Sequence, residues 1–340
     1  MRKILNGIHS WIPGAKPQKP KKEKLTKAER KRRKLAKREE ERLAREERRR
    51  NNPPKPRNKE REQETMDRLD ERSIAYFRPL LAELFPERKR GRKQADLINI
   101  LNGIMYQART GCQWRLLPRE FGNYTTVHKW LTKFKEVDLF RRFWELMIRE
   151  CEEVNAVDWQ WLAVDGSLGK SKRGNEDSGP NPTDRGKGGV KRSLMVEGNG
   201  YPIGLVISAA NIHDTNLLAD TLKVAFKPTR PQSFISRLLL DKGYANPTGR
   251  DAVKPYKYRI HLKTIGEEGL ISRYIAGDDG IPRRWKNERA HSWMNSYRAV
   301  KERRAAKTSN YEAVCEFVCG LLWYRRLYQA QNWIDVDRAA

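Results

Sequence analysis

The sequence predicts a mixed α/β domain that follows an all-helical region and a basic N-terminal arm. From about residue 153, short strand-like apolar runs alternate with helical ones, whereas residues 73–152 show only the helical period. Residues 1–72 contain 26 Lys and Arg but 13 Asp and Glu. We therefore expect three segments, 1–72, 73–152 and 153–328, with a short tail at 329–340.

The overall composition points to a polyanionic partner. The chain has 340 residues and a formal net charge of +28, which suits nucleic acid or an acidic membrane surface. A membrane-surface protein would need an amphipathic helix with bulky apolar residues, and the arm has none. No run of eighteen apolar residues and no secretory signal is present. We expect a cytoplasmic protein whose Cys315 and Cys319, on one apolar helical stripe, are core thiols rather than zinc ligands.

The basic arm is rich in helix formers but poor in apolar residues. Glu23–Arg50 is mostly Ala, Glu, Lys, Arg and Leu, and Asn51–Pro54 ends the pattern. We interpret residues 1–72 as a solvated helix or a disordered arm followed by a linker. It either aids solubility only or contacts DNA phosphates without sequence preference, and the basic excess favours phosphate contact.

The all-helical region contains a possible helix-turn-helix. A short turn at 118–121 precedes a helix that Thr126 can cap, in which Val127 and Phe134 face inward. The same helix presents basic residues outward, as a recognition helix would. These are His128, Lys129, Lys133 and Lys135. The alternative is an ordinary solvated face.

The α/β region begins with an apolar run, Trp161–Val164, that leads directly into Asp165. Gly198-Asn199-Gly200 between two apolar runs predicts a hairpin. A second apolar strand over 235–240 leads directly into Asp241. A fifth strand is expected over 258–262. Helices are expected over 214–226, 284–300 and 311–328.

Asp165 and Asp241 are candidate metal ligands because each follows a buried strand. Two desolvated carboxylates at neighbouring strand ends repel each other unless a cation lies between them. Carboxylate oxygens suit a hard divalent ion. The alternative is that each aspartate only begins a turn. Glu288 lies on a helical face with Arg284, His291 and Asn295, where it joins the site or forms a plain surface ion pair with Arg284.

Several motifs resemble the DDE transposases of bacterial insertion sequences, in the group named after insertion sequence five. They cover about three quarters of the chain in the family's order. The motifs are Arg109–Pro118, Val164–Ser167, Gly179–Lys187, Leu240–Tyr244, and Arg284-Trp285 with Glu288-Arg289 and Trp293. Ile281 and Asn295 depart from the Tyr and Lys of a related group's signature, which leaves substrate contacts there in doubt. The arm is not part of the family's core.

The resemblance implies a ribonuclease-H-like catalytic domain whose Asp165, Asp241 and Glu288 hold two Mg²⁺ ions, with Mn²⁺ as a substitute. Such a site hydrolyses a strand at the element's end and then joins the freed 3′-hydroxyl to target DNA. Asp184 and Asp214 lie outside this triad, as loop and helix-cap residues. Thr126, His128, Lys129 and Lys133 would contact the terminal inverted repeats. The candidates for phosphate contact are Lys187, Arg192, Arg284 and Arg289.

Joining two ends implies at least a homodimer on double-stranded DNA, in the nucleoid of a prokaryote. Two alternatives remain open. One is a related nuclease that cuts without joining. The other is a domesticated DNA-binding protein whose catalytic domain is silent.

Overall fold

The computed structural model describes residues 68–262, except 88, 89, 91, 92 and 173, and residues 285–339, together with Ala36 and Glu39. Side chains are described as far as residue 331. The chain divides into two compact units, residues 1–59 and 60–340, and every described residue except Ala36 and Glu39 belongs to the second. The expected arm therefore lies outside the described residues, apart from Ala36, Glu39 and residues 68–72.

A mixed sheet forms the body of the α/β region, as the alternating pattern predicts. Its five main strands lie in the order β4-β3-β1-β5-β6. β1 and β3 pair antiparallel, as do β3 and β4, whereas β1–β5 and β5–β6 are parallel. Two short strands also join the sheet. β2 pairs with the beginning of β3, and β7 pairs with the end of β1. The bounds are β1 Trp161–Ser171, β2 Gly179–Pro180, β3 Gly188–Glu197, β4 Pro202–Ala209, β5 Arg237–Leu240, β6 Arg259–Leu262 and β7 Glu302–Arg303.

The hairpin expected at Gly198-Asn199-Gly200 is confirmed. β3 and β4 pair on either side of it, and Gly200 adopts the left-handed conformation with φ of 85°. Glycine reaches this conformation without the steric cost of a Cβ atom. The tight turn therefore follows from local sequence alone.

Helices make up the described chain before β1. They are α3 Glu71–Leu84, α4 Leu97–Thr110, α5 Tyr124–Glu136 and α6 Leu139–Glu153, with 3₁₀ turns η1 Trp114–Leu116 and η2 Arg119–Phe121. Asp96 caps α4, and Gly111 ends it in the left-handed conformation with φ of 62°. The cap of α5 is Asn123 rather than the expected Thr126, because the Asn123 side chain accepts the Thr125 amide hydrogen.

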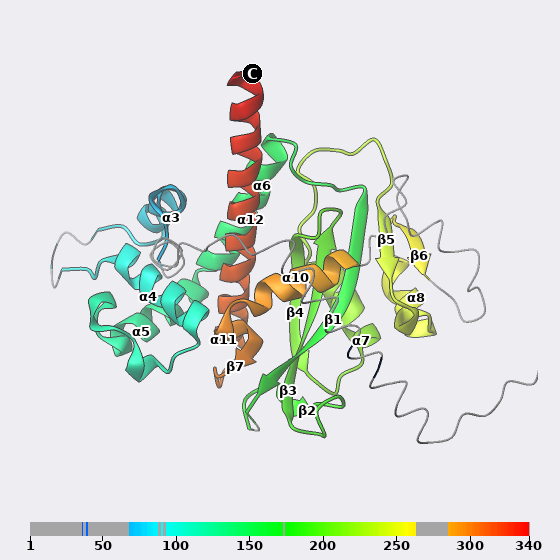
Figure 1. Ribbon diagram of the computed structural model, residues 1–340, viewed down its shortest axis with the longest axis horizontal. Helices are drawn as coiled ribbons and strands as arrows, with labels where there is room; N and C mark the ends of the chain where they lie inside the picture. The colour runs from blue at the N-terminus through cyan, green and yellow to red at the C-terminus, as the bar shows by residue number, and fades with distance from the viewer. Residues whose placement is uncertain are drawn as a thin grey trace, which may run out of the picture. The chain divides into compact units, whose positions relative to one another are not determined.

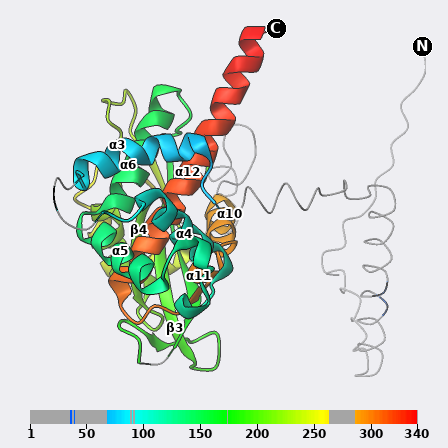
Figure 2. The same ribbon diagram turned by 90° about the vertical axis from the view of Figure 1, so that its left-hand side faces the viewer.

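The later helices are α7 Asp214–Val224, α8 Pro247–Val253, α10 Trp285–Asn295, α11 Arg298–Lys301 and α12 Thr308–Ala339, with η3 Lys242–Tyr244. α12 begins earlier and ends later than expected, so it includes most of the predicted tail. It packs along α6 and against β4, between the helical region and the sheet (Figure 1). Figure 2 shows α3 next to α6 on the helical side.

One hydrophobic core runs through both regions. Phe77 of α3 stacks on Phe143 of α6 with ring centroids 4.1 Å apart, and Phe140 lies 4.9 Å from Phe317 of α12. Cys315 and Cys319 are fully buried, as expected of core thiols, and burial raises the pKa of Cys315 to about 12. In the part of the chain that the structure describes, no helix is both long and apolar enough to cross a membrane.

Candidate active site

Asp165 and Asp241 lie side by side in the sheet. β1 and β5 run parallel, and their register pairs Val164 with Leu240. The residue that follows each of these two is an aspartate, Asp165 after Val164 and Asp241 after Leu240. Asp165 is not at the end of its strand as expected, because β1 continues to Ser171 by pairing with β3. Asp165 instead marks the point where pairing with β5 stops. The two carboxylates therefore share one edge of the β1–β5 pair.

A small cavity of about 30 Å³ opens between the two aspartates. Asn287 of α10 and His261 of β6 line it as well. A space of this size admits a water molecule or a small ion. Asp165, Asp241 and the first turn of α10 therefore meet around one small cavity.

Asp214 is a third carboxylate near this pair, and the sequence did not reveal it. A Cβ atom at Gly166 would collide with the Asp214 carboxylate, so that carboxylate packs directly against the residue after Asp165. Its Oδ1 atom lies 3.0 Å from Nζ of the buried Lys191. His213, not Asp214, caps α7. Asp214 was expected to be the cap residue of this helix. No local sequence pattern distinguishes a capping aspartate from one that packs against Gly166, as Asp214 does.

Tyr244 lies among all three aspartates. Its side chain is buried, and its hydroxyl group has no hydrogen-bond partner among the described residues. Burial raises the pKa of Tyr244 most, and the negative charges of Asp214, Asp165 and Asp241 raise it further. The hydroxyl therefore stays protonated and faces a strongly negative space.

Glu288 is exposed on α10, while its neighbours on that helix are buried. Asn287 is 2% exposed and His291 is 7% exposed. Burial and the Arg192 guanidinium lower the pKa of His291 to about 3, and the main chain of Asp165 acts in the opposite direction. His291 thus lies against Asp165, and Asn287 of the same helix lines the cavity beside Asp165 and Asp241. Among the described residues, however, no three His, Cys, Asp or Glu side chains converge closely enough to hold a metal ion.

Arg192 does not fit the expected role in phosphate contact. Its side chain is fully buried and donates hydrogen bonds to the Val300 carbonyl oxygen at 2.8 Å, to Ser167 Oγ at 2.8 Å and to Asn295 Oδ1 at 2.7 Å. A guanidinium with these partners cannot also reach DNA. Arg192 instead joins β3 to β1 and to the end of α10.

Arg289 also has protein partners rather than an open position. It donates a hydrogen bond to the Asn199 carbonyl oxygen, and its guanidinium carbon lies 4.6 Å from the centroid of the Trp293 ring. Lys286 likewise donates to the Gly198 carbonyl oxygen. Both residues attach α10 to the β3–β4 turn. Arg284 lies outside the described residues.

The expected DNA-binding residues of α5 divide into two sets. Lys129 and Lys133 are exposed, with the Lys133 ammonium 4.3 Å from the centroid of the Trp130 ring. Thr126 is half-buried, and His128 packs edge-on against Trp114 at 5.2 Å between ring centroids. Only two 3₁₀ turns separate α4 from α5. Lys187, on the loop before β3, is exposed and lies 3.5 Å from Asp184.

Comparison with known families shows two adjoining matches. Residues 69–144 match a family described as candidate transposases of the IS4/5 group, and residues 149–315 match the transposase DDE domain. The chain is 27% identical over 166 residues to a candidate transposase for insertion sequence element IS402 from Burkholderia cepacia, covering 47% of this chain and 74% of that protein. It is 28% identical over 103 residues to an uncharacterized 16.2 kDa protein of the same element, covering 29% and 70%.

Solved structures of two transposases are more distant. A piggyBac transposase synaptic complex with hairpin DNA is 18% identical with a TM-score of 0.31, covering 64% of this chain. The match spans 53% of the piggyBac chain, about half its length. A Mos1 transposase paired-end complex is 12% identical with a TM-score of 0.25, covering 72% of this chain and 82% of that one.

Proposed function

Because the chain belongs to the DDE transposases of bacterial insertion sequences, we propose that it binds its element's terminal inverted repeats, cleaves the ends and joins them to target DNA. The observation that carries the proposal is the pairing of Val164 with Leu240, which sets Asp165 beside Asp241. The strand order β4-β3-β1-β5-β6 supports a ribonuclease-H-like domain, in which three antiparallel strands are extended by two parallel ones.

The acidic pair fits a hard divalent cation. The ligands offered are carboxylate oxygens, which Mg²⁺ and Mn²⁺ prefer, and both carboxylates line one cavity. We propose that Asp165 and Asp241 hold Mg²⁺ with Glu288 completing the set for two ions, and that Mn²⁺ can replace it. Such ions, when bound, lower the pKa of the attacking hydroxyl and stabilise the leaving oxygen.

The surrounding residues maintain the negative charge that the cation needs. His291 is neutral at physiological pH because its pKa is about 3, so it adds no positive charge beside Asp165. Lys191 neutralises Asp214 through their 3.0 Å ion pair, which leaves the charge of Asp165 and Asp241 for the cation. The Tyr244 hydroxyl can donate a hydrogen bond to a ligand or water in this space.

DNA would be bound by exposed cations on several elements. We propose that Lys129 and Lys133 of α5 enter a major groove of the inverted repeat and that Lys187 contacts a phosphate. The arm over 1–72 would add affinity without sequence preference. Two chains would pair the two element ends on the bacterial nucleoid.

The direct test is incubation of the full chain with Mg²⁺ and duplex DNA carrying the element's inverted repeats. We expect end cleavage followed by joined products. Asp165→Asn, Asp241→Asn and Glu288→Gln should each lower the cleavage rate roughly a hundredfold or more, because each removes charge stabilisation worth several kcal/mol. Asp220→Asn, on the exposed side of α7, is the matched control and should cleave normally.

The same assay separates the alternatives. Cleavage without joined products would identify a nuclease, and repeat binding without cleavage would identify a silent DNA-binding protein. Unchanged cleavage by the Asp165→Asn or Glu288→Gln variant would refute the two-ion assignment.

A further inference from the structure

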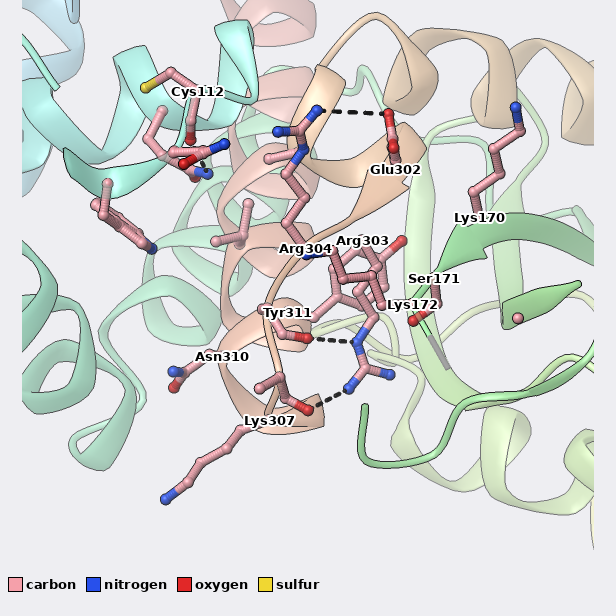
Figure 3. Close-up of a pocket in the computed structure, with 18 of the residues that line it drawn as sticks. Cys112, Lys170, Ser171, Lys172, Glu302, Arg303, Arg304, Lys307, Asn310 and Tyr311 are labelled. Atoms are coloured by element: carbon pink, nitrogen blue, oxygen red, sulfur yellow. Dashed lines mark hydrogen bonds and ion pairs between the residues drawn. The ribbon is translucent and has the colours of Figure 1, made fainter. Parts of the chain in front are cut away.

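A large cavity lies away from the acidic pair, between the helical region and the sheet. Its volume is about 870 Å³, and Figure 3 shows many of the residues that line it. The walls come from α5, the end of β1, the loop before β3 and the segment that joins β7 to α12. A cavity of this volume suits a ligand of nucleotide size and cannot hold a DNA duplex.

The rim of this cavity is strongly basic. Five of its cations are exposed, namely Lys170, Lys172, Lys187, Arg304 and Lys307. Two acids partly offset them, since Asp184 lies 3.5 Å from Lys187 and Glu302 lies 3.9 Å from Arg304. Within the described part of the chain, Lys170, Lys172 and Lys307 have no carboxylate at ion-pair distance. The rim therefore attracts an anion such as a phosphodiester.

The inner wall contains polar atoms that lack partners. Arg303 is 1% exposed and donates to the carbonyl oxygens of Ala305 and Ala306 at 3.0 and 3.1 Å. Its Nη1 atom and the Oδ1 atom of Asn310 are buried, and neither has a hydrogen-bond partner among the described residues. An unsatisfied buried donor or acceptor costs about 1–3 kcal/mol. Because both residues line the cavity, turning these side chains toward a ligand that offers an acceptor and a donor would remove that cost.

Aromatic surface completes the lining. Trp114 and His128 face the cavity from the side of α5 and pack edge-on against each other. Tyr311 lines the opposite side, at the start of α12 (Figure 3). Aromatic surface, a buried donor and acceptor, and a basic rim match the three parts of a nucleotide: base face, base edge and phosphate.

A second cavity of about 490 Å³ continues the first. Lys170, Glu302 and Arg304 line both, and the second adds the basic residues Arg298 and Lys301. We name the two together the basic groove. Lys170 lies on β1 five residues beyond Asp165, which corresponds to about 17 Å at the rise of an extended strand. A DNA strand of a few nucleotides can therefore extend from the acidic pair into the basic groove.

We propose that the basic groove binds single-stranded DNA, with an unpaired base in the larger cavity and its phosphates on the lysine rim. This rests on the proposed transposase function and adds to it the path of an unpaired strand beyond the cleaved phosphodiester. The duplex remains with α5 and the acidic pair, since the groove is too small for it.

The first test compares single-stranded with duplex DNA. Affinities of the full chain for a fluorescein-labelled thymidine 10-mer and for a blunt duplex are measured by fluorescence anisotropy at one fixed salt concentration. The double variant Lys172→Glu/Lys307→Glu should bind the single strand roughly tenfold or more weakly, because two lysines that contact phosphates become carboxylates that repel them. Duplex binding should change less than about threefold. Arg149→Glu/Arg230→Glu, an equal charge change at exposed sites outside the groove, should affect both ligands alike and weakly.

The second test asks whether a base enters the cavity. An abasic sugar-phosphate 10-mer should bind the unaltered chain roughly tenfold more weakly than the thymidine 10-mer, in line with the loss of base stacking. Asn310→Ala should weaken thymidine binding several-fold and leave abasic binding unchanged. Equal affinity for the thymidine and abasic oligomers would show that no base enters the cavity. Equal weakening of duplex and single strand by the lysine variant, or no weakening of either, would overturn the groove.

End cleavage of the inverted-repeat duplex is measured on the same preparations. If the unaltered chain cleaves and joins ends while the lysine variant binds the thymidine 10-mer normally, the groove proposal alone fails. If no cleavage or duplex binding occurs but single-strand affinity still depends on Lys172 and Lys307, the transposase proposal fails and the groove stands.

Discussion

Arg192 is a buried cation whose three hydrogen-bond acceptors come from three different elements. Val300 belongs to α11, Asn295 to α10 and Ser167 to β1, while Arg192 itself is on β3. Arg192 was among the candidates for phosphate contact. Its position on β3 explains the burial instead, because every residue from Gly189 to Glu197 is buried and neither face of this strand is open to DNA.

Replacing Arg192 should therefore cost stability. We expect Arg192→Ala to lower the free energy of unfolding by about 3–5 kcal/mol, since it removes a large, fully buried side chain and leaves Asn295 Oδ1 without the donor that Arg192 supplies. Lys187→Ala, at a side chain 64% exposed, should change it by less than about 0.5 kcal/mol. Urea unfolding of both variants checks this. A stable Arg192→Ala protein with weakened DNA binding would restore the phosphate role.

Residues near the acidic pair were predictable to different degrees. Asp165 and Asp241 could be found because each follows a local apolar run, and a local run is visible in sequence. Asp214 could not, because its approach to Gly166 depends on how α7 packs across the sheet. Thr126 and Asn123 are both good capping residues, so the sequence alone does not say at which one the helix begins.

The turn between β3 and β4 holds α10 in place at the scale of whole elements. The Glu197 carboxylate accepts backbone N–H groups from Asp158, Asn199 and Tyr201 at 2.8, 2.9 and 3.0 Å, which fixes the turn. Lys286 and Arg289 then donate to the outward carbonyl oxygens of that turn. Glu288 lies between these two residues, so its position depends on the hairpin.

We expect Arg289→Met to act on catalysis rather than on DNA affinity. Loosening α10 should raise the Mg²⁺ concentration needed for half-maximal cleavage several-fold, because Glu288 is the proposed ligand carried by that helix. Affinity for the inverted-repeat duplex and its salt dependence should not change, and Lys223→Met on α7 is the matched control. Weaker duplex binding with a reduced salt slope would instead show that Arg289 contacts a phosphate, as the sequence suggests.

The local elements were predictable, and their pairing was not. Apolar periodicity and the Gly198-Asn199-Gly200 turn identify the hairpin and most helices. The parallel alignment of β1 with β5 joins residues that are far apart along the chain, and no local pattern specifies it. The continuation of β1 beyond Asp165 also needs β3 as a partner. Here the family resemblance supplied what periodicity could not.

At the scale of the whole molecule, α6 and α12 form a seam between the helical region and the sheet, and this seam contains buried charge. Glu316 of α12 lies 3.6 Å from Arg141 of α6, with Glu312 one turn away on α12. Burial and the negative charge of Glu312 raise the pKa of Glu316 to about 7, although Arg141 acts in the opposite direction. Two carboxylates thus compete for one guanidinium.

Stability should fall between acidic and neutral pH because of this seam. Folding raises the pKa of Glu316 from its ordinary 4.5 to about 7, so the folded state binds the proton more tightly. The resulting stabilisation is complete below about pH 4.5 and is lost as the pH rises through 7, on the order of 3 kcal/mol in all. Glu316→Gln should remove this part of the pH dependence, as measured by urea unfolding at pH 5 and pH 8.

The control for the seam is Glu145→Gln on α6, whose carboxylate is 41% exposed and pairs only with Arg149 among the described residues. It should keep the pH dependence of the unaltered chain. A Glu316→Gln variant with that same dependence would show that the buried carboxyl does not titrate in this range.

The position of α12 late in the sequence affects when the protein can fold during synthesis. Residues 308–339 are synthesised after every strand of the sheet, yet Phe317 and Trp323 fill the space between α6 and β4. Until they leave the ribosome, the apolar faces of α6 and of the hairpin have no cover. The hydrophobic core of the nascent chain can therefore form only after α12 has been synthesised. Until then the uncovered apolar surface is accessible to chaperones and proteases.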